Sequence, residues 1–164
     1  MAKVTPQDAQ SLKTLLQRQI NAATAVMEKL KYEREALEQR KFDAVTLMQK
    51  DKHSLLAQLN DTEEARQQLM TKMELELGQA GFDEFCTFVP PQWRAAFSDL
   101  WNERKTLLEA CKKANEINGR VLYHTQVAAE RVMAAIRGQT QAQFVYNAKG
   151  RKGYVQGPRQ LAVA

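Results

Sequence analysis

The sequence predicts an all-α fold: an elongated up-and-down bundle of three or four long helices, partly coiled-coil, with a basic extended C-terminal tail. Aromatic residues make up 7% of the chain and there are four prolines, a composition that favours long helices over a sandwich or barrel. Apolar residues recur at spacings of three, four and seven, which is the period of one helix face. The formal net charge of +5 lies entirely in residues 137–164. We therefore expect a helical bundle over residues 1–136 and a basic, glycine-containing tail over residues 137–164, which orders on a partner or on the bundle.

The first predicted helix runs from about Thr5 to Arg40. Its apolar stripe consists of Leu12, Leu16, Ala23, Met27, Leu30 and Leu37. Thr5 before Pro6 is a favourable start, because a threonine side chain caps a free backbone N–H and proline at the first helical position gives up no needed donor. At a rise of about 1.5 Å per residue the helix is on the order of 50 Å long, which predicts an elongated bundle.

The second predicted helix begins at Asp43, whose carboxylate is able to cap the following turn, and continues to Leu77. Gly78 and Gly81 are expected to close it. Residues 41–42 form either the tight turn of a helical hairpin or a kink in one bent helix, and the sequence leaves both open.

Charged residues interrupt or flank these two helices. Lys52 and Arg66 break the apolar stripe of the second helix, so its inner face is predicted to be less apolar than that of a permanently buried helix. Glu33, Glu35 and Glu38 lie among lysines and arginines at helix-pair spacings. We interpret these three glutamates as a solvated charged face.

The segment from Gly78 to Pro91 is predicted as a loop. Its apolar residues are expected to cap one end of the bundle; these are Phe82, Phe85, Phe88 and Val89. A third long helix then runs from Pro91 to Ile136. Gly119 lies in its middle, where glycine costs about 1 kcal/mol relative to alanine, so a break or a close contact with another helix is expected there.

The third helix contains the motif Asn115-x-x-Asn118-Gly119. Asn118 falls on the apolar stripe, between Ala114 and Val121. A buried asparagine is costly unless its amide is paired, so it often fixes helix register or bonds a neighbouring helix. We favour that structural role for the motif, and direct binding of a partner is the alternative.

No catalytic, cofactor-binding or metal-binding residue is expected, and the protein is not expected to be an enzyme. His53 and His124 are the two histidines, and neither has a cysteine or second histidine at the short spacings of zinc sites. A phosphotransfer role for His53 is an alternative, but His53 is not followed by the His-x-x-Lys-Gly pattern of helical phosphotransfer domains. The glycines of residues 150–153 lack the strand and spacing of a phosphate-binding loop.

Nothing in the sequence predicts export or membrane insertion. The N-terminus has no apolar stretch long enough for a signal peptide, and no window approaches the roughly 18 apolar residues of a membrane helix. We therefore expect a cytoplasmic protein in which both cysteines are reduced.

The order of these features resembles the FlgN-type flagellar export chaperones. A neutral helical hairpin is followed by Asn-x-x-Asn-Gly and an apolar pair, and then by Tyr-Asn-x-x-Gly after the last helix. The residues that carry the resemblance are Asn115, Asn118, Gly119, Leu122, Tyr146 and Gly150. The resemblance implies a small cytosolic protein that binds hook-filament junction proteins, prevents their premature assembly and delivers them to the flagellar type III export gate.

The resemblance also implies which residues bind. Pairing of an amphipathic helix with the C-terminal helices of the hook-associated junction proteins uses apolar anchors at helical spacing. The expected cargo contacts are Leu122, Val132, Ile136, Phe144, Val145 and Leu161. Tyr146 is expected to dock to the cytoplasmic domain of the export gate, with Asn147 and Gly150 shaping its turn; alternatively, Tyr146 anchors the tail on the bundle. The sequence also leaves open a homodimer of the free protein.

Two other functions remain open from the sequence. One is a structural coiled-coil adaptor. The other is single-stranded nucleic-acid binding through the tail, where aromatic residues are interspersed with four cationic residues. The tail residues concerned are Lys149, Arg151, Lys152, Arg159, Phe144, Tyr146 and Tyr154. Because the body is electrically balanced and offers no basic face, nucleic acid is not the expected partner.

Overall fold

The structure, a computed structural model, describes residues 3–137, 144–146 and 152–154. It is an all-α bundle, as predicted, in which four helices account for almost all of the regular structure in these residues. Contacts divide the chain into two compact units, residues 1–122 and residues 123–164. The domain boundary predicted from the sequence, at the end of the last helix, stays a prediction.

Helix α1 (Pro6–Glu38) begins where the sequence predicts. The Thr5 side chain accepts a hydrogen bond from the Asp8 N–H at 3.1 Å, and the Asp8 carboxylate accepts one from the Thr5 N–H at 3.1 Å. This reciprocal capping box satisfies two backbone donors that a helix start otherwise leaves unpaired. Lys72 also donates to Asp8 at 2.9 Å. Hydrogen bonds from Thr5 and Lys72 lower the pKa of Asp8 to about 2.

Helix α2 (Phe42–Lys72) pairs with α1 as a hairpin, which settles the choice between a turn and one bent helix. The connection turns at Arg40, which has a φ of 56°. Two details of the predicted helix were wrong. The structure starts α2 at Phe42 without a side-chain cap, so Asp43 lies in its first turn. The helix also ends at Lys72 rather than Leu77, because Glu74 takes up the left-handed conformation with a φ of 55°.

The predicted loop after α2 contains a further helix, α3 (Gln79–Phe88), so that prediction was wrong. Gly78 caps α3 and Gly81 lies inside it, so neither glycine closes α2. Three of the four apolar residues expected to cap the bundle are buried, whereas Phe88 is exposed; the buried residues are Phe82, Phe85 and Val89.

Helix α4 (Pro91–Ile136) has the bounds that the apolar period predicts, and it is continuous. The expected break or close contact at Gly119 is absent: Gly119 is exposed, and a Cβ atom placed on it meets nothing within 4 Å beyond the neighbouring backbone of its own helix. Packing along the rest of this long helix outweighs the free-energy cost of one glycine, so the helix does not break there.

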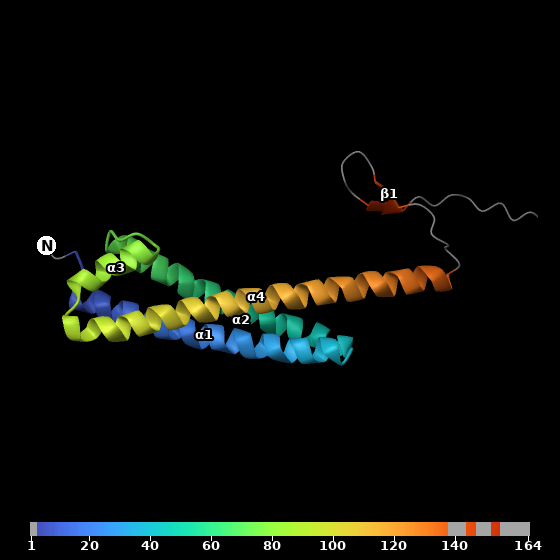
Figure 1. Cartoon of the computed structure of the whole chain (residues 1–164), viewed down its shortest axis with the longest axis horizontal. Helices are drawn as coiled ribbons and strands as arrows, with labels where there is room; N and C mark the ends of the chain where they lie inside the picture. The colour runs from blue at the N-terminus through green and yellow to red at the C-terminus, as the bar shows by residue number, and fades with distance from the viewer. Residues whose placement is uncertain (1–2, 138–143, 147–151, 155–164) are drawn as a thin grey trace, which may run out of the picture. The chain divides into compact units, whose positions relative to one another are not determined.

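In residues 1–122, α1, α2 and the first part of α4 lie side by side, and α3 packs at the end where α1 begins (Figure 1). Residues later in α1 contact residues later in α4, so these two helices are parallel. Helix α2 runs in the opposite direction. The α1–α4 contacts that show this are Gln19 with Arg104, Ala23 with Cys111, and Leu30 with Asn118.

Three apolar clusters fill the core of this unit. The first includes Leu12, Phe85 and Trp101 at the α3 end. The second lies around Val26 and Leu59, and its members come from α1, α2 and α4. The third joins the α1–α2 turn to α4; its buried members are Ala36, Leu37 and Val45. Between successive clusters lie buried polar residues, which are described with the site.

The second unit contains the last turns of α4 and a two-stranded antiparallel sheet, β1 (Phe144–Tyr146) and β2 (Lys152–Tyr154). The register pairs Phe144 with Tyr154 and Tyr146 with Lys152. These two strands were not predicted from the sequence. No helix among the described residues is long and apolar enough to cross a membrane.

Candidate partner-binding surface on helix α4

Asn118 lies inside the bundle and joins α4 to α1. It is 2% exposed, and its Nδ2 donates to the Leu30 carbonyl at 2.9 Å and to Glu33 Oε2 at 2.8 Å. Glu33 Oε1 accepts from Gln49 at 2.7 Å and from Lys52 at 2.6 Å. Burial favours the neutral form of Glu33, but the hydrogen bonds from Lys52, Asn118 and Gln49 outweigh it and lower the pKa of Glu33.

This polar layer corrects one interpretation from the sequence. Glu33 is 2% exposed, so it does not belong to a solvated charged face. Lys52, which interrupts the α2 stripe, is the cation that pairs with it. Asn115 is half-buried and Gly119 is exposed, so of the three motif residues Asn118 alone reaches this layer. The layer favours one register of α4 against α1, because a shift would leave the buried Asn118 amide and Glu33 Oε2 without the hydrogen bond between them.

A second polar layer lies nearer the α3 end. Arg66 donates to both oxygens of Glu63, at 3.0 and 2.7 Å, and Arg104 donates to Glu63 Oε2 and to Gln19 Oε1, each at 3.3 Å. Both guanidinium groups lie over the Trp101 ring, 5.2 and 4.4 Å from its centroid. Burial acts to raise the pKa of Glu63, but its hydrogen bonds prevail and lower it to about 2. This layer also explains why Arg66 interrupts the α2 stripe.

The C-terminal part of α4 presents apolar side chains to solvent. Val132 is 59% exposed, Met133 48% and Ile136 74%. Leu122 is half-buried and packs on the cluster of the α1–α2 turn. We call the apolar face of residues 125–136 the α4 face. Val132 and Ile136 were predicted from the sequence, but Met133 was not. Its position four residues after Ala129 is the helical spacing that could have identified it.

The remaining predicted contacts lie in the tail. Phe144, Val145 and Tyr146 form β1, and the structure describes their backbone pairing alone. Outside the described residues lie Asn147, Gly150 and Leu161.

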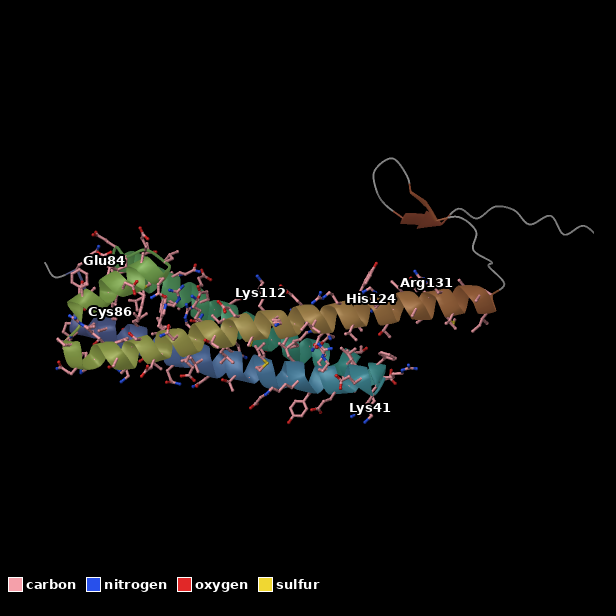
Figure 2. All side chains as sticks on the ribbon, in the orientation of Figure 1. Lys41, Glu84, Cys86, Lys112, His124 and Arg131 are labelled. Atoms are coloured by element: carbon pink, nitrogen blue, oxygen red, sulfur yellow. The ribbon has the colours of Figure 1, made fainter. Side chains whose placement is uncertain are left out.

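Neither histidine is buried: His53 and His124 are both exposed. His53 Nδ1 lies 2.7 Å from the Gln49 carbonyl. Within residues 3–137 and the two strands, no group of three potential metal ligands occurs. Cys86 lies on α3 (Figure 2), and burial raises its thiol pKa, as it does for Cys111.

The fold matches a known class of structure. A flagella synthesis protein described as FlgN, from Pseudomonas aeruginosa, has a similar crystal structure with a TM-score of 0.63. The match covers 73% of this chain and 91% of that protein, at 24% sequence identity. The likeness therefore defines the fold as that of a FlgN-like helical bundle. Comparison with curated proteins gave no match.

The sequence identifies the family. The family model described as FlgN protein matches residues 1–153, which include the four helices, β1 and all but the last residue of β2. This chain belongs to the FlgN family, as the resemblance of its motifs predicted. Membership of this family places the protein in the class of flagellar chaperones.

Proposed function

We propose that this protein is a cytoplasmic export chaperone for the hook-filament junction proteins. It binds their C-terminal helices, prevents premature assembly and delivers them to the flagellar type III export gate. Family membership supports the chaperone class. The proposed activity is binding and release, without catalysis.

The observation that supports the binding site is the α4 face. Apolar side chains at helical spacing are normally buried, yet Val132, Met133 and Ile136 remain open to solvent. A junction protein's terminal helix carries an apolar face that stays unsatisfied until the protein polymerises. Packing of the two faces removes both from water, which is the helix-in-groove mode of recognition. Leu122, Phe144, Val145 and Leu161 complete the proposed cargo contacts.

The tail supplies the second proposed contact. Tyr146 docks to the cytoplasmic domain of the export gate, and Asn147 and Gly150 shape the turn that presents it. Cargo binding and gate docking use different residues, which allows one molecule to hold both partners.

Size-exclusion chromatography with light scattering tests the proposal. The protein is mixed with each purified junction protein, either full-length or without its C-terminal helix. We expect a stable complex with the full-length proteins and none with the truncated ones. If folded full-length junction proteins give no complex, or if the truncated forms bind equally well, the proposal is wrong.

A further inference from the structure

The width of the α4 face defines the shape of the partner that covers it. At 100° per residue, six of the eight apolar positions of residues 125–136 span an arc of about 160°, with Ala135 at one edge and Met133 at the other, and Val127 and Ala134 lie outside it. The charged residues Glu130 and Arg131 lie outside this arc, and Figure 2 shows Arg131 with His124 along α4. A seam between two helices is narrower, because it uses two positions in seven.

The same helix shows what covers such an arc. In residues 91–122, α4 packs against two helices at once. Arg104 hydrogen-bonds Gln19 of α1 and Glu63 of α2, and the middle apolar cluster joins residues of all three helices. The positions that make these contacts repeat every seven residues through Cys111 and Asn118, and the repeat continues to Val132. The α4 face is therefore a continuation of an interface that two helices occupy.

We propose that the partner covers the α4 face with two helices lying side by side, rather than with one. The inference rests on the proposed function and adds to it the form in which the cargo is held. No charge lies within the arc, so both partner helices present apolar residues there and the contact is insensitive to salt. The Ala128 and Ala135 edge leaves room for large partner side chains, whereas the Met133 edge carries a long side chain of its own.

Single substitutions at the two edges test the inference. Ala135→Glu and Met133→Glu each place one negative charge at an edge of the arc, and Arg131→Glu, which reverses a charge outside the arc, is the control. All three positions are exposed, and circular dichroism verifies that the helix is unchanged. Isothermal titration of full-length junction protein should show at least about a tenfold loss of affinity for each edge variant and less than about threefold for Arg131→Glu. A peptide of the partner's C-terminal helix alone should lose affinity for just one of the two edge variants.

The outcomes separate the two proposals. If the wild-type protein binds and just one edge variant is impaired, a single helix covers the face and the two-helix inference is wrong. If neither edge matters while the complex still forms, the cargo binds elsewhere and the inference is again wrong. Absence of any complex with the wild-type protein overturns the proposed function, and the inference falls with it.

Discussion

Glu33 and Glu63 decide how the three long helices align. Glu33 is buried and accepts hydrogen bonds from Lys52 of α2 and Asn118 of α4. Glu63 is half-buried and accepts hydrogen bonds from Arg66 of its own helix and from Arg104 of α4. Such layers contribute little net stability, because desolvation offsets the attraction. Their effect is on specificity: a helix that slides by one turn leaves a buried charge without its partner.

Removal of the Asn118 amide tests this at the first layer. Asn118→Ala leaves Glu33 Oε2 without its 2.8 Å donor inside the bundle. We expect the free energy of unfolding to fall by about 2 to 4 kcal/mol. Urea denaturation measures it, with Asn115→Ala, at a half-buried position on the same helix, as the control. Equal losses for the two variants would show that the buried hydrogen bonds are not the cause.

The second layer makes stability depend on pH. The pKa of Glu63 is lowered from its ordinary 4.5 to about 2, so its carboxylate stabilises the fold above the unfolded-state pKa. That contribution is lost as pH falls from about 5 to about 2. At about 1.4 kcal/mol per pKa unit, reduced because Glu63 is 32% exposed, it is on the order of 2 kcal/mol.

Glu63→Gln should therefore be less stable than wild type at pH 7, and the difference should shrink toward pH 2. Urea unfolding at a series of pH values measures this difference. Asp8, whose pKa is also about 2, retains its own dependence in the variant. A difference that stays constant over the whole range would contradict the assignment.

Helix ends are the elements that the sequence predicted least well. Both α1 and α2 end with a residue at positive φ, Arg40 and Glu74, followed by a backbone N–H that bonds back to the last turn; these bonds join Lys41 to Ala36 and Leu75 to Met70. Such termini usually carry glycine. Because neither terminus has glycine at this position, nothing in the sequence marked the end of α2. The nearby glycines serve α3 instead.

Two glycine substitutions should act in opposite directions. Gly119→Ala adds a methyl group at an exposed helical position where nothing lies within 4 Å beyond the neighbouring backbone of the helix, so it should stabilise the protein by about 0.5 to 1 kcal/mol. Gly81→Ala places a Cβ atom against the Glu76 backbone, and should destabilise it. Thermal unfolding of the two variants compares them. A destabilised Gly119→Ala would reveal a helix contact that the structure does not contain.

Long-range pairing set the limits of prediction. The long helices and the burial of Asn118 follow from apolar period, which is local information. The partner of Glu33 could not be read in the same way, because Lys52 and Gln49 come from another helix. Helix α3 was missed because its glycines and short length are typical of a loop. The strands of the tail were missed because their pairing depends on a turn, and no alternation marked them.

At the scale of the whole molecule, rigid packing and open binding surface lie on one helix. Between Pro91 and Leu122, α4 is held by two polar layers and three apolar clusters. Its last turns carry the exposed residues Val132, Met133 and Ile136. A helix whose first part is fixed can present its last part without a large loss of conformational entropy on binding.

The affinity for full-length junction protein, measured by isothermal titration at about 50 and about 200 mM salt, tests the central claim most directly. The double variant Val132→Asp/Ile136→Asp is compared with wild type, and urea unfolding verifies that its fold is intact. We expect at least about a hundredfold loss of affinity in the variant, and less than about a threefold effect of salt on wild type. Wild-type affinity in the variant, or a steep fall with salt, would contradict an apolar chaperone surface on α4.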